Sequence, residues 1–157
     1  MSLMIKNFSV IYRDGDHSIQ AVEEVTLAVK RGQCLALVGE SGSGKTTLGK
    51  ACLGLLPENA ETAGRIFLND REIDFANETA LNQMRWQKIS MVFQNGAETL
   101  NPAYRVIDQV AEPAMEKGGE NRKSALKRAS RALFDMGLPE SCHGRYPHQL
   151  SGGQVQR

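Results

Sequence analysis

The chain has 157 residues, enough for one domain that buries roughly two thirds of the surface of its unfolded form. Lysine and arginine number 19 and aspartate and glutamate 18, and this net charge of +1 gives no general attraction to nucleic acid or anionic lipid. No apolar run approaches the roughly 20 residues of a membrane-spanning helix, and the alternating N-terminus is not the pattern of a signal peptide.

Three stretches in the first half of the chain alternate between apolar and polar residues, at positions 4–12, 25–29 and 65–68. The last of them is followed by a polar turn at 69–71. Alternation with a period of two is typical of half-buried strands. The pattern predicts a small antiparallel β layer, packed on a core that holds the motif between its second and third strands.

That motif, at residues 39–46, reads GESGSGKT and fits the spacing G-x-x-x-x-G-K-[ST] of a phosphate-binding loop. The apolar run at 34–38 predicts a strand buried on both faces of a parallel sheet, and a helical pattern runs from Thr47 to Pro57. Strand, loop and helix together form the context in which this motif binds nucleotide. A glycine-rich loop that matches by accident is the alternative, and the register of both flanks argues against it.

The chemistry of nucleotide binding explains these residue types. Glycines let the backbone adopt positive φ and approach an anion closely, so that successive N–H groups surround a phosphate at a helix N-terminus. Lys45 would place its charge on the β- and γ-phosphates, and the Thr46 hydroxyl would ligate Mg²⁺. The predicted phosphate-binding residues are Gly39, Ser41, Gly42, Ser43, Gly44, Lys45, Thr46 and Thr47.

Residues 89–93 predict another strand, which ends at Gln94, and the small and polar residues of 95–101 predict a mobile surface loop. Two helices should follow, one from Val106 that Pro113 kinks or restarts, and one after a break at 118–119. The second has an apolar face formed by Leu126, Ala129, Leu133 and Met136. Its basic residues Arg122, Lys123, Lys127, Arg128 and Arg131 are interpreted as a solvated face rather than a docking surface.

Residues 151–154 read SGGQ, which has the form of a capping box in which Gln154 reaches back to the N–H of Ser151. Two glycines in a first helical turn cost about 1 kcal/mol each relative to alanine, so stability does not select them. A helix N-terminus without bulky side chains does offer its backbone N–H groups to a phosphate. An ordinary cap on a surface helix is the alternative, and these four residues by themselves favour it.

The order of these motifs resembles that of a known family. Residues 39–46, 91–94 (MVFQ) and 150–157 (LSGGQVQR) resemble the Walker A, Q-loop and signature motifs of an ABC transporter ATPase subunit. Their neighbours at 100–102 and 146–150 are similar to the peptide and nickel importer branch, the oligopeptide and dipeptide permease ATPases. The resemblance covers nearly the whole chain. It departs from the branch at Asn95-Gly96, which usually reads Asp-Pro, and at Val155.

The resemblance implies an α/β fold, a P-loop NTPase core with a small antiparallel β subdomain and a helical subdomain. The C-terminal part of the core sheet would be missing. Residues 1–157 would then be a partial ABC ATPase domain, with the β subdomain and P-loop core at 1–94. The Q-loop and helical subdomain would occupy 95–150, and the signature helix would start within 151–157.

The resemblance also implies roles for individual residues. Gln94 would reach Mg²⁺ or the attacking water, as a catalytic residue beside Lys45 and a metal ligand beside Thr46. Tyr12 would stack on adenine, with simple packing at a strand end as the alternative. The signature residues Ser151, Gly152, Gly153 and Gln154 would contact the γ-phosphate bound to a second subunit.

The implied cofactors are ATP and Mg²⁺. Two ATPase subunits, identical or paralogous, would pair head to tail around two nucleotides and act on transmembrane permease subunits. An extracytoplasmic solute-binding protein would be an indirect partner, and nucleic acid would not be a partner. The chain would be cytoplasmic and peripheral on the inner face of the cell membrane, where ATP binding and hydrolysis would be coupled to uptake of peptides or nickel.

The family's Walker B aspartate, catalytic glutamate and switch histidine do not occur in these 157 residues. We therefore expect the chain by itself to be an inactive ATPase, and we expect its parallel sheet to expose apolar side chains. Two other classes stay open: a different P-loop enzyme, such as a kinase or GTPase, and a non-catalytic module that binds nucleotide or a partner without turnover. The cysteines Cys34, Cys52 and Cys142 are expected as buried free thiols rather than disulfides or metal ligands.

Overall fold

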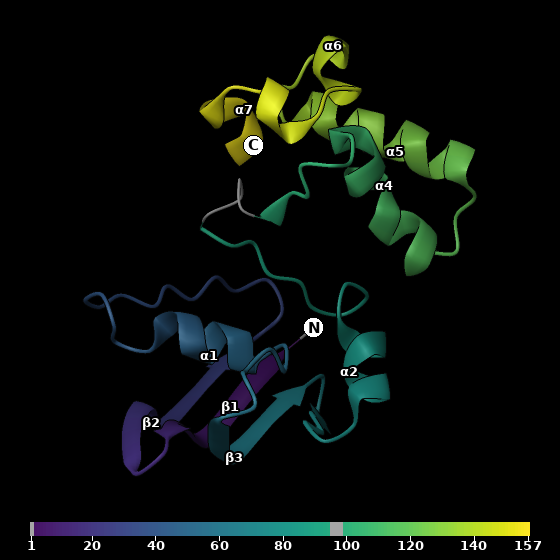
Figure 1. Cartoon of the computed structure of the whole chain (residues 1–157). Helices are drawn as coiled ribbons and strands as arrows, with labels where there is room; N and C mark the ends of the chain where they lie inside the picture. Colours follow the sequence, from purple (N-terminus) through teal and green to yellow (C-terminus); the bar gives the residue numbers. More distant parts are fainter. Residues whose placement is uncertain (1, 95–98) are drawn as a thin grey trace. The chain divides into compact units, whose positions relative to one another are not determined.

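The computed structural model describes residues 2–94 and 99–157 (Figure 1). The chain divides into two compact units, Met1–Ser90 and Met91–Arg157, which are described separately. The first contains β1 (Leu3–Asp14), β2 (His17–Val29), α1 (Lys45–Ala51), β3 (Ala60–Leu68), β4 (Arg71–Glu72) and α2 (Glu78–Met84). The second contains α4 (Val106–Glu116), α5 (Arg122–Asp135), α6 (Glu140–His143), the 3-10 helix η1 (Pro147–Gln149) and α7 (Gly152–Gln156). None of the helices in the described ranges is long and apolar enough to cross a membrane.

A four-stranded antiparallel sheet with the order β2-β1-β3-β4 forms the frame of the first unit. β1 and β2 form a hairpin that closes where Asp14 pairs with His17. The turn between β3 and β4 consists of Asn69 and Asp70, whose φ angles of 51° and 61° are those a tight hairpin turn requires. The predicted antiparallel β layer and its polar turn are therefore confirmed.

The core of this unit lies against the central strands of the sheet. Ile5, Phe8 and Val10 of β1 and Ile66 of β3 are its largest fully buried side chains. The helix α1 adds Leu48, which is also buried, and Figure 1 shows α1 beside the sheet. Burial of apolar surface thus holds the helix that follows the glycine-rich loop.

Two segments expected as strands of a parallel sheet have no strand pairing among the described residues. Residues 34–38 form no ladder, and 89–93 take part in a single isolated bridge. Apolar side chains in both segments are exposed as expected, with Val38 at 93% and Val92 at 95%. A run that is apolar on both faces forms a strand only when neighbouring strands complete its backbone hydrogen bonds. Since no described segment does so, the prediction of these two strands is wrong for this structure.

In the second unit α4 and α5 pack against each other. Small side chains at the contact, Ala111, Ala125 and Ala129, let the two helices approach closely. A further buried cluster joins α4 and α5 to α6 and consists of Val106, Leu133, Leu138 and Cys142. The two predicted helices are confirmed, and α4 continues through Pro113 without restarting. Most of the loop expected at 95–101, including Asn95-Gly96, lies outside the described residues.

The outer side of α5 is exposed and basic. Three of its arginines form ion pairs with carboxylates, Arg122 with Asp108, Arg128 with Glu120 and Arg131 with Asp135. Exposed pairs of this kind contribute about 0 to 1 kcal/mol each, which suits the solvated face expected from the sequence. Met136 was predicted on the apolar face but is 58% exposed, because it lies at the C-cap, beyond the last residue of the helix.

The three cysteines are free thiols, and they differ in burial. Cys52 and Cys142 are buried, as predicted. Cys34 is exposed, so the prediction of burial is wrong there. The cause is the same as for the missing strand, since Cys34 begins the run 34–38, which no strand in the described part of the chain covers.

Candidate functional site

The glycine-rich loop leads directly into α1, and Gly44 is the N-cap residue of that helix. Its φ is +83°, and a Cβ atom there would lie 2.1 Å from the carbonyl oxygen of Ala21 in β2. Only glycine can adopt this left-handed backbone at such a close approach. The Gly44 carbonyl accepts a hydrogen bond from the N–H of Leu48 at 2.9 Å. Gly44 therefore fixes where α1 begins and allows the loop to pack closely against β2.

The side chain of Lys45, the first residue of α1, folds over the loop. Its ammonium donates to the carbonyl oxygens of Gly39 at 2.9 Å and Glu40 at 2.6 Å, and to Ser43 Oγ at 2.9 Å. These acceptors all belong to the 39–46 loop. The lysine charge is thereby added to the partial positive charge of the helix N-terminus. An arrangement of this kind suits the binding of an anion.

A pocket of about 550 Å³ lies beside the loop. One wall is formed by β2 between Gln20 and Val25, and the other by loop residues that include Gly42 and Lys45. Thr46 is exposed at the same end of α1. The described residues contain no cluster of three or more His, Cys, Asp or Glu that could hold a metal. The exposed hydroxyl of Thr46 suits Mg²⁺ bound together with a nucleotide, because that ion commonly takes its ligands from phosphates and water and few from protein.

The structure brings Tyr12 to the first turn of α1. Its hydroxyl donates to Thr47 Oγ1 at 3.3 Å, although the two residues are 35 positions apart in the chain. The ring therefore lies in the same unit and beside the same helix as the phosphate-binding loop. Stacking on adenine stays a prediction.

The motif at 151–154 forms the N-terminus of α7, with Ser151 as the N-cap. Gln154 Oε1 accepts a hydrogen bond from the N–H of Ser151 at 3.0 Å, which confirms the predicted capping box. Gln154 Nε2 donates to Cys142 Sγ at 3.6 Å. Both ends of this amide are thus used to orient α7. The exposed backbone of Gly152 and Gly153 is the part of the motif that remains suited to a phosphate.

The predicted site residues fall into two groups. Tyr12 and the loop at 39–46 belong to the first unit, whereas Gln94 and the motif at 151–154 belong to the second. Gln94 is exposed and follows a segment without strand pairing. The structure shows the contacts within each group, and a shared metal ion between Thr46 and Gln94 stays a prediction.

The sequence interpretation missed Gln109 of α4, which organises the segment after the Q-loop motif. Gln109 Oε1 accepts from the N–H of Asn101 at 2.8 Å. Its Nε2 donates to the carbonyl oxygens of Asn101 at 2.9 Å and Tyr104 at 3.0 Å. An amide near the start of a helix that follows an Asn-Pro turn is the only sequence signal for this role. Arg85, at the end of α2, was also missed and is described below.

Comparisons with known proteins agree with this geometry. The family model described as ABC transporter matches residues 22–157. A peptide import ATP-binding protein of Brucella abortus is 38% identical over 156 residues, which cover 98% of this chain and 46% of that protein. The dipeptide transport ATP-binding protein DppD of Lactococcus lactis is 36% identical over 159 residues, covering 99% of this chain and 46% of that protein.

Solved structures show the same fold, so the predicted α/β class is confirmed. The dimeric ATP-binding cassette MJ0796, in a post-hydrolysis state with ADP and Pi, matches with a TM-score of 0.86 at 30% identity, covering 98% of this chain and 65% of that one. CbiO1 of Clostridium perfringens, part of the transporter complex cbiONQ, has a TM-score of 0.71 at 25% identity. The chain spans about half the length of the curated relatives it matches. Since the family model covers most of its residues, the chain belongs to the ABC transporter family.

Proposed function

We propose that the chain binds Mg·ATP through the loop at 39–46, as part of the ATP-binding subunit of an ABC importer. The position of Lys45 carries this proposal. Its ammonium lies within the loop that forms the N-terminal end of α1, and Gly42 of the same loop has open space around its Cβ position. The positive charge of Lys45 and the backbone N–H groups of the same loop together suit the binding of a polyphosphate.

Nucleotide binding would require Lys45 to exchange its present acceptors for the β- and γ-phosphates. The exchange is favourable because a charged phosphate oxygen accepts a stronger hydrogen bond than a neutral carbonyl oxygen. Thr46 and Gln94 would hold Mg²⁺, which when bound neutralises charge on the same phosphates. Tyr12 would stack on the adenine ring beside α1.

The other parts of the transporter are inferred from the motif on α7 and from the named relatives. Gly152 and Gly153, with Ser151, would contact the γ-phosphate held by a second ATPase subunit, identical or paralogous. The dimeric cassette MJ0796 supports such pairing. Relatives named for peptide and dipeptide import support peptides over nickel as the solute. Permease subunits would then hold the protein at the inner face of the membrane, with a solute-binding protein as an indirect partner.

Titration calorimetry of Mg·ATP into the wild-type chain and into Lys45→Ala tests the proposal. Lys50→Ala is the matched control, since Lys50 lies in the last turn of the same helix. We expect Lys45→Ala to weaken binding about 100-fold, because hydrogen bonds to charged groups contribute roughly 1.5 to 3 kcal/mol. Lys50→Ala should bind like the wild type. Absence of binding by the wild type, or equal affinity in Lys45→Ala, would show that the proposal is wrong.

A P-loop enzyme of another kind predicts a different result in related assays. A kinase or GTPase would discriminate between adenine and guanine or transfer phosphate to a second substrate. The proposed subunit should depend little on the base and should pair with a second copy or a paralogue when ATP is bound. A non-catalytic module would bind ATP without releasing phosphate above the level of Lys45→Ala, which is also our expectation for this chain by itself.

A further inference from the structure

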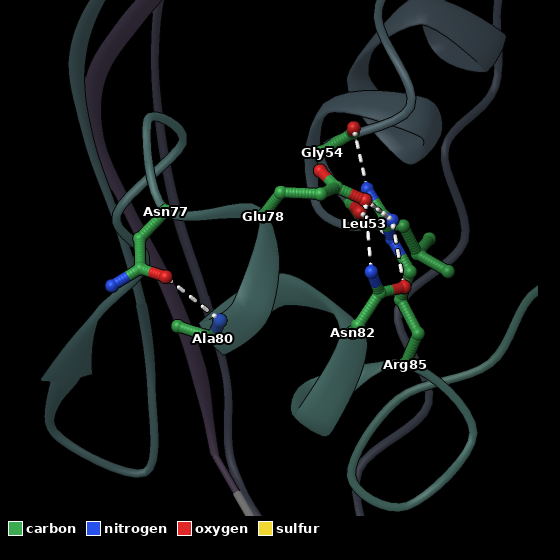
Figure 2. A network of polar contacts seen from close by, with 7 residues as sticks. All are labelled: Leu53, Gly54, Asn77, Glu78, Ala80, Asn82 and Arg85. Atoms are coloured by element: carbon green, nitrogen blue, oxygen red, sulfur yellow. Dashed lines mark hydrogen bonds and ion pairs between the residues drawn. The ribbon is translucent and has the colours of Figure 1, made fainter.

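Arg85, at the end of α2, holds the C-terminal end of α1 (Figure 2). Its Nε donates to the carbonyl oxygen of Leu53 at 2.8 Å, and its Nη2 donates to that of Gly54 at 2.8 Å. Both carbonyl groups lie just beyond the last residue of α1. A positive charge at this position is also favourable because it lies near the negative end of the helix dipole.

The guanidinium is itself fixed by the rest of α2. Nη1 lies 2.6 Å from Glu78 Oε1 and 3.4 Å from Asn82 Oδ1, as Figure 2 shows. Asn82 Nδ2 in turn donates to the Glu78 carboxylate at 3.2 Å. The Arg85 side chain is only 16% exposed. A planar group held by carbonyl, amide and carboxylate oxygens at once is a geometry that a lysine ammonium cannot reproduce.

Close packing joins the same two helices. Leu81 of α2 is 3% exposed and lies against Gly54. A Cβ atom at position 54 would be 2.9 Å from Leu81 Cδ1, and the φ of Gly54 is +63°. The end of α1 therefore cannot shift without displacing α2.

Arg85 also stands at the start of the segment that leads to Gln94. It is the C-cap of α2, and a single bridge pairs it with Ile89. The turn between them is closed by a hydrogen bond from the N–H of Trp86 to the carbonyl oxygen of Ile89 at 2.9 Å. Ile89 is the first residue of the 89–93 segment, which ends at Gln94.

We propose that Arg85 is a positioning residue that makes α1 and the turn at 86–89 move as one body. The N-terminal end of α1 carries Lys45 and Thr46, so the guanidinium would position these two residues of the nucleotide site by holding the other end of the same helix. The link to nucleotide rests on the proposed function. The link between α1 and the turn is independent of nucleotide and rests on the contacts of Arg85 and on the packing of Leu81 against Gly54.

Amide hydrogen exchange without nucleotide tests that link, in the wild type and in Arg85→Ala, Arg85→Lys and Glu78→Gln. The matched control is Arg65→Ala, which removes an exposed arginine of β3 paired with Glu72 at 3.8 Å. We expect Arg85→Ala and Arg85→Lys to raise exchange roughly tenfold in α1 and at the N–H of Trp86 together, with β1 and β3 unchanged. Glu78→Gln, which keeps the guanidinium, should have a smaller effect, and Arg65→Ala none.

Mg·ATP titration supplies the second readout, at temperatures where every variant is folded. We expect Arg85→Ala and Arg85→Lys to weaken binding about tenfold, the usual effect of losing a residue that supports a ligand-binding group. A purely structural role would lower the melting temperature and leave the affinity of the folded protein unchanged, and this result would overturn the proposal. Exchange that rises in only one of the two segments, or in neither, would overturn it as well.

The outcomes separate this inference from the proposed function. If the wild type binds no Mg·ATP, the proposed function fails, and the exchange measurement by itself decides the role of Arg85. If Arg85→Ala does not fold, Arg85→Lys keeps the charge and Glu78→Gln keeps the guanidinium, so the comparison with Arg65→Ala is still made.

Discussion

Cys52 follows the last residue of α1 and is buried. Removal from water raises the pKa of its thiol from 9.0 to about 11. The unfolded chain thus loses this proton near pH 9 and the folded chain only near pH 11. The contribution of the neutral thiol to stability is fully present below pH 9 and is lost as the pH rises through 11.

We therefore expect the stability advantage of the wild type over Cys52→Ala to shrink by roughly 2 to 3 kcal/mol between pH 8 and pH 11. Urea denaturation of both proteins at several pH values measures this difference, and other titrating groups cancel because both proteins share them. The same burial should leave Cys52 unmodified by a thiol reagent at pH 8, while the exposed Cys34 reacts. Equal modification of the two folded-state thiols would contradict the prediction.

Single residues could be predicted from the sequence where the backbone demands one residue type. Gly44 is such a case, because the motif spacing requires glycine there and the Ala21 carbonyl leaves no room for a side chain. Contacts between residues distant in the chain could not be predicted. Nothing in the local sequence indicates that Gln154 bonds to the thiol of Cys142, because only the folded backbone brings them together.

At the scale of elements, Gln109 joins α4 to the segment at 101–104. It makes hydrogen bonds with both the N–H and the carbonyl oxygen of Asn101, and a further one with Tyr104. The conformation of residues 101–104, which lead into α4, should therefore depend on the Gln109 amide.

We expect Gln109→Leu to raise amide exchange at Asn101 roughly tenfold and to destabilise the second unit by about 1 to 2 kcal/mol, because the N–H of Asn101 loses its partner. Gln109→Glu is the informative comparison. It keeps the acceptor for that N–H and loses the two donors, so Asn101 should stay protected. If both variants exchange like the wild type, the amide does not hold the segment.

Periodicity was sufficient for elements that bury one face. The alternating pattern at 4–12 and the helical spacing from Val106 gave β1 and α4, because each has a face covered within its own unit. The runs at 34–38 and 89–93 show the limit of the method. Their composition is that of buried strands, but a strand also needs neighbours, and a local pattern does not contain them.

On the scale of the whole molecule, each unit has its own buried core. Ile66 lies in the sheet core of the first unit, and Leu133 lies in the helical cluster of the second. The resemblance noted in the sequence correctly identified the ABC transporter family, whose model matches residues 22–157. The same resemblance implied a boundary between the P-loop core and the helical subdomain at 94/95, and the two compact units meet in the chain at 90/91.

Separate cores predict separate responses to core mutations. We expect Ile66→Ala to destabilise the first unit by about 2 to 5 kcal/mol and to increase exchange in β1 and β3. Exchange in α4 and α5 should change little. Leu133→Ala should produce the reverse pattern. A single cooperative loss of protection across the chain in both variants would show that the units unfold together.

Exposed apolar residues such as Val38 and Val92 have a consequence for behaviour in solution. The net charge is only +1, so long-range repulsion between molecules is weak near neutral pH. It therefore does little to oppose association through these exposed apolar residues. Concentrated samples at neutral pH should therefore cluster, more so in sulfate buffers that strengthen apolar association. Mild acidity, which adds positive charge as carboxylates become protonated, should keep the particles apart for as long as the fold survives.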